Sequence, residues 1–273
     1  FCDSLRNAWG GGDVIWLAKG EAAEFTIPTL PDTHWDVWDT AQKMGVDLVI
    51  VPTANRRKKM LLADMDSTMI EQECIDELAA EAGVGERVAA ITARAMNGKL
   101  NFEAALRERV GLLKGLPVAT IQRVIDTRLS LMPGGPILLA TMKANGAYAA
   151  LVSGGFTAFT SHIVARLGFD EHRANTLLTD GDILTGVPGT PILGQAAKVE
   201  ALEHITAHLS LTDDDVLAVG DGANDLGMLT RAGMGVALHA KPSVQAQCDI
   251  RINHGDLTAL LYLQGYKRDQ FVT

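Results

Sequence analysis

Short apolar runs that each end in polar or glycine-containing residues constrain the fold of this chain more than any other feature. Segments with helical periodicity separate four of these runs, which are Met60–Ala63, Tyr148–Val152, Val216–Val219 and Met234–Leu238. Strands that alternate with helices predict a doubly wound α/β fold, in which helices cover both faces of a parallel sheet. Because such sheets bind ligands beyond the carboxyl ends of their strands, we expect the functional residues directly after these runs.

A long helical and strand-poor segment interrupts this alternation at about residues 75–130. Apolar side chains recur there on one helical face, and Asn101 is a candidate N-cap for the helix that carries them. The apolar positions are Phe102, Leu106, Val110 and Leu113. A helical insertion between the first two core strands predicts a cap over the strand ends.

Residues 177–187 contain Asp180-Gly181 between two short β-like runs, a pattern typical of a β-hairpin. The glycines and prolines from Gly186 to Pro191 predict a loop after it.

Residues 1–58 differ in pattern from the rest of the chain and predict a small accessory α+β segment. Two β-like runs, Asp13–Leu17 and Asp47–Val51, frame an acidic, tryptophan-containing helical stretch at residues 33–44. The segment ends at the basic run Arg56–Lys59, which we interpret as a linker. We therefore divide the chain into residues 1–58 and a main domain of residues 59–273.

Charge and hydropathy exclude two classes of partner. The formal charge of -9 argues against nucleic acid, because phosphate backbones require clustered basic residues and Arg56–Lys59 is the single tight basic run. No window approaches the roughly 18 apolar residues of a membrane span. The three cysteines, Cys2, Cys74 and Cys248, are far apart and lack metal-ligand spacing, which favours reduced thiols and a cytoplasmic location.

Two carboxylates follow the first core strand, in the sequence Asp64-Met65-Asp66-Ser67-Thr68. At an extended strand end, side chains at i and i+2 point to the same side. One carboxylate could then attack a substrate while the other transfers a proton. Alone, Asp-x-Asp is common and fits a polar strand end equally well.

A second motif, Gly220-Asp221-Gly222-Ala223-Asn224-Asp225, follows another core strand and strengthens the first. Its glycines permit a tight turn, and three short oxygen-bearing side chains, Asp221, Asn224 and Asp225, are suited to a hard metal ion. Two acidic motifs at the ends of parallel strands favour a metal site.

Two further signals lie between these motifs. Ser153-Gly154-Gly155 follows an apolar run, which would place a hydroxyl and backbone N–H groups at the same sheet edge as a phosphate cradle. Lys198 begins a helical stretch, where position alone predicts an ordinary solvated lysine.

In this order, DxDxT, hydrophobic-Ser-Gly-Gly, a lysine and GDGxND resemble the motif set of the haloacid-dehalogenase-like phosphohydrolases. Residues 64–77, 101–115 and 220–229 are similar to the phosphoserine phosphatases of that family, and the resemblance spans residues 60–255. It implies the family's α/β core with an inserted helical cap. Residues 1–58 match only loosely, by position, an accessory amino-acid-binding domain that some members carry.

The resemblance implies a role for each motif residue. Asp64 would be the nucleophile that forms an aspartyl-phosphate, and Asp66 the acid and later the base. The implied Mg²⁺ ligands are Asp64, the backbone carbonyl of Asp66 and Asp221, with Asn224 and Asp225 in or near the shell. Ser153, Lys198 and the N–H of Gly154 would bind the phosphoryl oxygens.

The insertion would select the substrate, which the resemblance identifies as O-phosphoserine in the last step of L-serine biosynthesis. Arg109 matches the position that binds the substrate carboxylate, and Glu73 the position that faces its ammonium group. Met96 and Phe102 match apolar residues of the cap.

Several alternatives stay open. A phosphatase for phosphothreonine or a phosphotransferase would use the same motifs, because one methyl group in a pocket discriminates by only about 1–3 kcal/mol. A sugar-phosphate phosphatase would not need Arg109. A non-catalytic amino-acid sensor would bind through residues 1–58, and the motif residues argue against it. The oligomeric state is open, with a homodimer as one alternative.

Overall fold

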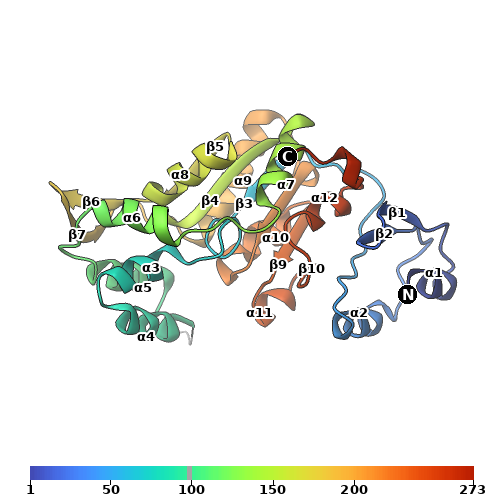
Figure 1. Cartoon of the computed structure of the whole chain (residues 1–273), viewed down its shortest axis with the longest axis horizontal. Helices are drawn as coiled ribbons and strands as arrows, with labels where there is room; N and C mark the ends of the chain where they lie inside the picture. Colours follow the sequence, from blue (N-terminus) through green and yellow to red (C-terminus); the bar gives the residue numbers. More distant parts are fainter. Residues whose placement is uncertain (97–99) are drawn as a thin grey trace.

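A computed structural model describes residues 1–96 and 100–273, without the side chains of residues 95 and 96. At its centre is a sheet of order β10-β9-β8-β3-β4-β5, in which every neighbouring pair is parallel (Figure 1). The strands are β3 (Met60–Ala63), β4 (Tyr148–Phe156), β5 (Glu171–Asn175), β8 (Val216–Gly220), β9 (Met234–Leu238) and β10 (Ile250–Ile252). The predicted sheet and its four predicted strands are confirmed, and β5 and β10 are additional.

Successive residues of the strands enter two separate hydrophobic cores. In β3, Leu61 and Ala63 join the core with α7 and α8, whereas Met60 and Leu62 join the core with α9 and α10 on the opposite face. The covering helices are α7 (Gly135–Ala144), α8 (Thr157–Leu167), α9 (Gln195–Leu209), α10 (Leu226–Arg231), α11 (Pro242–Gln245) and α12 (Ala259–Leu263). Because Leu62 is fully buried, its truncation to alanine would cost about 2–5 kcal/mol. The fold is doubly wound, as predicted.

The strand order reverses direction beside β3. The chain runs from β3 to β4 and β5 on one side, and then returns to place β8, β9 and β10 on the other. Such a reversal leaves a crevice beyond the carboxyl ends of the two strands that flank it, here β3 and β8. The DxDxT and GDGxND motifs directly follow these two strands.

Helices occupy the insertion between β3 and β4. They are α3 (Cys74–Glu81), α4 (Gly85–Met96), α5 (Phe102–Gly111) and α6 (Ala119–Arg128). Asn101 caps α5 as predicted, because its Oδ1 accepts a hydrogen bond of 2.8 Å from the Ala104 N–H. Leu106 and Val110 on the predicted apolar face are buried. The division of the chain at residues 58 and 59 stays a prediction.

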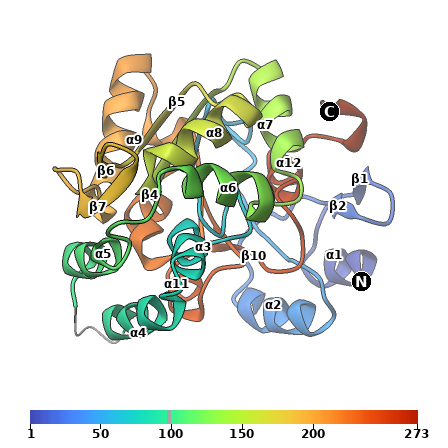
Figure 2. The ribbon, with the colours of Figure 1, turned by 60° about the vertical axis from the view of Figure 1, so that its left-hand side comes forward.

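A β-hairpin that follows β5 packs against the cap. Strands β6 (Leu177–Asp180) and β7 (Ile183–Pro188) are antiparallel, which confirms the predicted hairpin. The Leu184 N–H donates to Leu116 O at 2.9 Å, and the Gly115 N–H donates to Leu184 O at 2.8 Å. The hairpin thus lies beside α5 (Figure 2). β7 continues into the loop expected from Gly186, because Pro188 pairs with Leu177.

The first 58 residues form α1 (Cys2–Ala8), the antiparallel strands β1 (Ile15–Ala18) and β2 (Ala22–Glu24), and α2 (His34–Lys43). The predicted helix is confirmed, but the predicted strand Asp47–Val51 is wrong. Its backbone has no ladder partner because Asp47 instead accepts hydrogen bonds from the backbone N–H groups of residues 253–255, while Val49 and Val51 pack against the core. The segment lies at the opposite end of the molecule from α4 and α5 (Figure 1).

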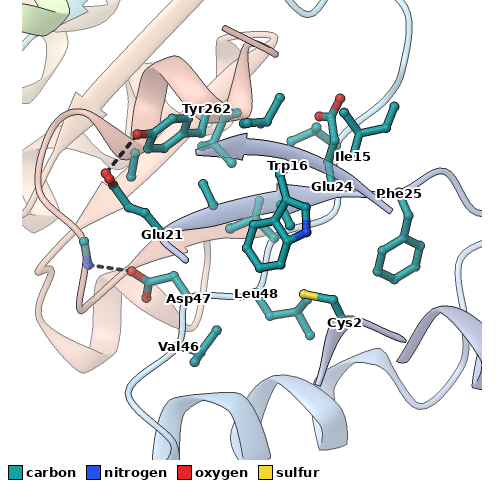
Figure 3. A pocket seen from close by; sticks show the side chains of 18 of the residues that line it. Cys2, Ile15, Trp16, Glu21, Glu24, Phe25, Val46, Asp47, Leu48 and Tyr262 are labelled. Atoms are coloured by element: carbon teal, nitrogen blue, oxygen red, sulfur yellow. Dashed lines mark hydrogen bonds between the residues drawn. The ribbon is translucent and has the colours of Figure 1, made fainter. Parts of the chain in front are cut away.

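A cavity of about 1160 Å³ lies between this segment and the C-terminal part of the main domain. Figure 3 shows Trp16, Leu48 and Tyr262 around it. The Tyr262 hydroxyl donates to Glu21 at 2.8 Å, which joins the two sides. No predicted site residue lines this cavity, so it is separate from the predicted active site.

Each residue of the basic run Arg56–Lys59 contacts another residue of the chain. Arg56 pairs with Glu24 at 2.6 Å, Lys58 donates to Asp214 O at 2.7 Å, and Lys59 pairs with Asp215 at 2.9 Å. Arg57 lies over the ring of Tyr266. None of the helices within the described ranges combines the length and the apolar character of a membrane span.

Candidate active site

Asp64 and Lys198 form a buried ion pair at the carboxyl end of β3. Lys198 Nζ lies 2.7 Å from Asp64 Oδ2 and 2.5 Å from Asp225 Oδ1. Burial lowers the pKa of Lys198, but the two carboxylates outweigh burial and leave it raised. Burial and the Asp225 charge also raise the pKa of Asp64 well above its usual range, against the effect of Lys198. The lysine is thus a fixed internal cation, and not the solvated lysine that its position predicts.

Asp225 shapes the loop after β8 as well as holding Lys198. Its Oδ2 accepts hydrogen bonds from the backbone N–H groups of Asp221 at 3.1 Å and Gly222 at 2.9 Å. A side chain at Gly220 would overlap with the Asp225 carboxylate, which explains the first glycine of the motif. Asn224 folds back so that its Oδ1 lies over Gly222. Asp221 keeps its side chain free of such loop contacts and faces the cluster.

The cluster fits a divalent cation. One oxygen each from Asp64, Asp221 and Asp225 lie within 4.8 Å of one another, and all three residues are buried. Burial, then the charge of Asp225, raises the pKa of Asp221 to about 7. The buried ammonium group of Lys198 contacts two of these three buried carboxylates, and Lys241 acts on Asp221, so the cluster retains an excess of acidic groups over cations among the described residues. An oxygen-only donor set favours a hard ion such as Mg²⁺.

Asp66 lies beside this cluster, next to Ser153. A Cβ added to Gly155 would lie 2.9 Å from Asp66 Oδ2 and 3.0 Å from Ser153 Oγ, so only glycine fits between them. Asp66 accepts a long hydrogen bond of 3.4 Å from the Cys74 N–H at the start of α3. Burial and the charge of Glu73 raise the pKa of Asp66 to about 7. A carboxyl group with this pKa can both donate and accept a proton near neutrality.

Ser153 lies within β4 and not just beyond it. The strand continues to Phe156 because Phe156 still pairs with Asn175 of β5, across an irregularity in register. Ser153 is buried, and its Oγ accepts a hydrogen bond of 2.9 Å from the Gly155 N–H. The irregularity places Ser153 and Gly154 at the sheet edge that carries Asp64 and Asp66.

Two cap residues of opposite charge lie near Asp66. Burial lowers the pKa of Arg109, and the charges of Asp76, Glu73 and Asp66 act on it in the opposite direction. Arg109 is half-buried, and its Nε donates to Ala105 O at 3.3 Å. Glu73 is exposed and accepts a hydrogen bond of 2.8 Å from Ser67 Oγ. The charges of Arg109 on α5 and of Glu73 at the start of α3 therefore both interact with that of Asp66.

Phe102 brings the cap into contact with the backbone at Gly154 and Gly194. Its ring lies 3.1 Å from the position that a Cβ on Gly154 would occupy, and 3.2 Å from the equivalent position at Gly194. Met96 ends α4, and its side chain lies outside the described residues.

One residue of the site has no signal in the sequence. Asn175 is 2% exposed, and its side chain forms hydrogen bonds with the backbone of two segments, at Gly154 and at Leu193. It ends β5, whose polar sequence Glu171–Asn175 does not resemble a buried strand. No motif or spacing could have identified it.

Residues 61–230 match the family model of the haloacid dehalogenase-like hydrolases. The chain belongs to this family. The match begins in β3 and ends in α10, so it includes the ends of β3, β4 and β8, the inserted cap helices and the helix that carries Lys198. The family resemblance and the α/β core that it implies are confirmed.

Curated relatives in this hydrolase family are phosphoserine phosphatases. The chain is 42% identical over 222 residues to the enzyme of Archaeoglobus fulgidus, 45% over 204 residues to that of Haemophilus influenzae, and 42% over 206 residues to that of Methanocaldococcus jannaschii. These alignments cover 81%, 75% and 76% of this chain. They cover 97% of the Methanocaldococcus protein, but only 64% and 65% of the other two.

Solved structures of the family have the same fold. A HAD family hydrolase of Salmonella enterica serovar Typhi superposes with a TM-score of 0.88 at 34% identity, covering 96% of this chain and 93% of that one. A substrate-bound phosphoserine phosphatase superposes with a TM-score of 0.71 at 42% identity, covering 75% of this chain and 97% of that one. The first similarity extends over nearly the whole chain, so the N-terminal segment lies within it.

Proposed function

We propose that this hydrolase is a phosphoserine phosphatase, which converts O-phospho-L-serine and water to L-serine and phosphate in the last step of L-serine biosynthesis. One observation carries the proposal: the buried Asp64–Lys198 pair lies beside Asp66, whose charge interacts with those of Arg109 and Glu73 from the cap, and Phe102 of the cap contacts Gly154. A reactive carboxylate thus shares one site with groups that fit a zwitterionic amino acid.

Asp64 is the proposed nucleophile. Attack by its carboxylate on phosphorus forms an aspartyl-phosphate and breaks the bond between phosphorus and the serine oxygen. Attack requires the ionised carboxylate. Burial and the charge of Asp225 raise the pKa of Asp64, whereas Lys198 at 2.7 Å lowers it and so favours the ionised form, as a bound cation beside the carboxylate would too. The same lysine can then bind a phosphoryl oxygen as negative charge builds up.

Asp66 is the proposed acid and base. Its pKa, raised to about 7, allows it to donate a proton to the departing serine oxygen. The resulting carboxylate then takes a proton from the water that cleaves the aspartyl-phosphate. The two aspartates have different roles because Asp64 contacts Lys198 directly, whereas Asp66 lies beside Ser153 and is influenced by Glu73.

Ser153, Gly154 and Lys198 are the proposed phosphoryl-binding groups. Ser153 contributes its hydroxyl, Gly154 its backbone N–H and Lys198 its ammonium group. Ser153 and Gly154 lie in the last part of β4, which pairs with β3, and Lys198 lies on α9 within 2.7 Å of Asp64. These donors are preorganised because Ser153 and Lys198 are both buried within the core.

Mg²⁺ is the proposed cofactor, and it would supply charge neutralisation and orientation of the phosphoryl oxygens. The ligands would be Asp64, Asp221 and the backbone carbonyl of Asp66, with Asn224 and Asp225 in or near the shell. The three-carboxylate cluster supports this assignment. Both oxygens of Asp225 already accept hydrogen bonds, so we assign it mainly to holding the loop and Lys198.

The cap is proposed to select the amino acid. Arg109 would bind the substrate carboxylate through two parallel hydrogen bonds, and Glu73 would face the ammonium group. Phe102 and Met96 would enclose the short side chain. A sugar phosphate offers neither charge, which favours the amino-acid phosphate over that alternative.

The deciding experiment measures phosphate release from O-phospho-L-serine with Mg²⁺ and with EDTA, for wild type and Asp64→Asn. We expect rapid release that requires the metal and is lost in the variant. Phosphothreonine and a sugar phosphate serve as competitors. Faster release from the sugar phosphate would contradict the roles of Arg109 and Glu73, and no release from any substrate would contradict the enzymatic function.

Two further assignments complete the proposal. Cys2, Cys74 and Cys248 are free thiols, which supports a reducing compartment such as the cytoplasm. A homodimer is a proposal that sedimentation of the purified chain would test.

A further inference from the structure

The strand that carries the phosphate cradle contains a bulge. β4 pairs Val152 with Arg173 and then Phe156 with Asn175, so β4 advances by four residues while β5 advances by two. The extra residues are at Ser153–Gly155. Backbone groups in a bulge lose their ladder partners and must be satisfied in another way.

The side-chain amide of Asn175 provides a hydrogen-bond partner for this bulge. Its Nδ2 donates to Gly154 O at 2.9 Å and to Leu193 O at 3.1 Å, and its Oδ1 accepts from the Leu193 N–H at 2.7 Å. Both amide hydrogens and the amide oxygen are therefore used. Since the side chain is 2% exposed, water cannot replace these bonds. The amide fixes the separation and orientation of two backbone segments that are 39 residues apart in the sequence.

Both segments lead directly into the site. In the first segment, Asn175 holds the Gly154 carbonyl and so fixes the plane of the peptide between Gly154 and Gly155. This peptide follows the Gly154 N–H, which we propose to bind the phosphoryl group. In the second segment, Leu193 lies two residues before α9, whose fourth residue is Lys198. Lys198 is itself 1% exposed and lies 2.7 Å from Asp64.

The two held segments also form the sides of a slot for the cap. The Phe102 ring contacts Gly154 from one segment and Gly194 from the other, at 3.1 and 3.2 Å from the ideal Cβ positions. A change in the distance between the segments would therefore alter how Phe102 fits as well as where Lys198 lies.

We propose that Asn175 is a positioning residue, which sets the distance between the Gly154 backbone and the start of α9 and thereby orients the phosphoryl-binding groups and the Phe102 slot. This inference rests on the proposed phosphatase function. Asn175 does not contact the reacting atoms, so its effect must act through Gly154, Lys198 and Phe102.

The test compares Asn175→Asp with a matched variant, Gln264→Glu. Gln264 is 1% exposed and its amide also bonds to two backbone groups, Leu260 O at 3.1 Å and the Lys58 N–H at 3.0 Å, but it lies outside the site. Asn175→Asp keeps the size of the side chain while it turns an oxygen toward the carbonyl oxygens of Gly154 and Leu193. Both variants should lower the melting temperature.

Only Asn175→Asp should impair catalysis. We expect kcat to fall about 100-fold, because a displacement of about 1 Å in positioned groups has this effect, and Gln264→Glu to keep kcat within about twofold of wild type. Equal kcat values for the two variants at a temperature where both are folded would overturn the proposal.

A second variant tests the Phe102 slot of the proposal independently, including the case in which Asn175→Asp does not fold. Gly194→Ala leaves the Asn175 bonds in place but adds a Cβ 3.2 Å from the Phe102 ring, so we expect a several-fold higher KM with kcat less affected. In a Phe102→Ala background, Gly194→Ala should have no further effect on KM. If the two substitutions had additive effects on KM, the proposal that Gly154 and Gly194 form a slot for Phe102 would be wrong.

The readout separates this inference from the proposed function. The variants are assayed with O-phosphoserine and with p-nitrophenyl phosphate. If wild type hydrolyses p-nitrophenyl phosphate but not O-phosphoserine, the proposed substrate is wrong, yet the comparison of the variants still tests the positioning role of Asn175. If wild type hydrolyses neither, the shift in melting temperature caused by inorganic phosphate with Mg²⁺ replaces kcat; it should be smaller in Asn175→Asp than in Gln264→Glu, and equal shifts would overturn the proposal.

Discussion

Lys198 Nζ lies 2.7 Å from Asp64 Oδ2, and both side chains are almost completely buried. Asp225 contacts the same ammonium group from the loop after β8. One cation therefore joins a residue at the end of β3 to a residue at the end of β8. Since the partners are desolvated, removal of the lysine would leave two carboxylates uncompensated.

Lys198→Met should therefore affect both activity and stability. We expect kcat to fall at least about 100-fold, and the free energy of unfolding to fall by roughly 3–5 kcal/mol, the usual cost of breaking a buried pair. Phosphate release and denaturant unfolding measure the two effects. Asp64→Asn in the Lys198→Met background should recover part of the stability and none of the activity. An unchanged unfolding midpoint in Lys198→Met would contradict the buried pair.

Mg²⁺ should stabilise the folded chain through the carboxylate cluster. At a concentration about 100 times its Kd, a ligand that binds only the folded state adds about 2.7 kcal/mol, which thermal unfolding detects. We expect Asp221→Asn to reduce this gain strongly. Asp182→Asn, at an exposed position in the hairpin turn, is the matched control and should keep it. If Mg²⁺ added the same stability to both variants, the cation would bind at a site other than the carboxylate cluster.

Arg109→Ala should lower kcat/KM for O-phosphoserine at least about 30-fold, because truncating one partner of a desolvated charge pair costs at least about 2 kcal/mol. Hydrolysis of p-nitrophenyl phosphate, which has no carboxylate at that position, should change little. Arg107→Ala on the same helix is the matched control, since Arg107 is exposed and pairs with Glu103. Equal losses on both substrates would show that Arg109 supports the cap and not substrate recognition.

Asp215 should stabilise the fold in a pH-dependent manner. The Thr212 backbone N–H and Lys59 lower the pKa of Asp215 from 3.8 to about 2. A lowered pKa means that the unfolded chain binds the proton more readily, so the stabilisation is full above about pH 5 and is lost as the pH falls from about 4 to 2. We expect the free energy of unfolding of Asp215→Asn to be about 1 kcal/mol lower at neutral pH, because the hydrogen bonds from Thr212 to the Asp215 carboxylate, which cap the short helix Asp213–Asp215, are weakened.

Thermal unfolding of wild type and Asp215→Asn between pH 7 and pH 3 checks this prediction. The difference between their melting temperatures should narrow below pH 4. The exposed neighbour Asp214 provides the control, because Asp214→Asn should differ little from wild type at any pH. A difference that widens toward pH 3 would have the wrong sign and would contradict the assignment.

The fold was predictable where apolar runs are buried on both faces. All residues of β3 and β8 are buried, so their sequences show no polar interruption. β5 escapes prediction because its edge position leaves Glu171–Ala174 only partly buried, and polar side chains fit there. Asp47–Val51 has the composition of a strand, but its apolar side chains pack on the core and line the cavity without a partner strand.

The site was predictable where chemistry requires particular residue types at strand ends. Asp64, Asp221 and Ser153 follow from the motifs, whereas a phosphoryl-binding role for Lys198 follows only from the family resemblance, because its helical position predicts a solvated lysine. Asn175 could not be predicted. Its role depends on the bulge in β4 and on the return of the chain at Leu193, which are properties of the assembled sheet.

Asp64 and Asp221 directly follow β3 and β8, and Ser153 lies in β4, which also pairs with β3. Main-chain hydrogen bonds hold these strands about 4.8 Å apart and so set the lateral spacing of the three residues. Side-chain substitutions elsewhere cannot easily change that spacing. The groups that we propose to select the substrate come instead from the helical insertion between β3 and β4. Evolution can therefore replace the insertion and acquire a new substrate while the reaction itself is inherited unaltered, which makes the cap the natural target for redesigning specificity.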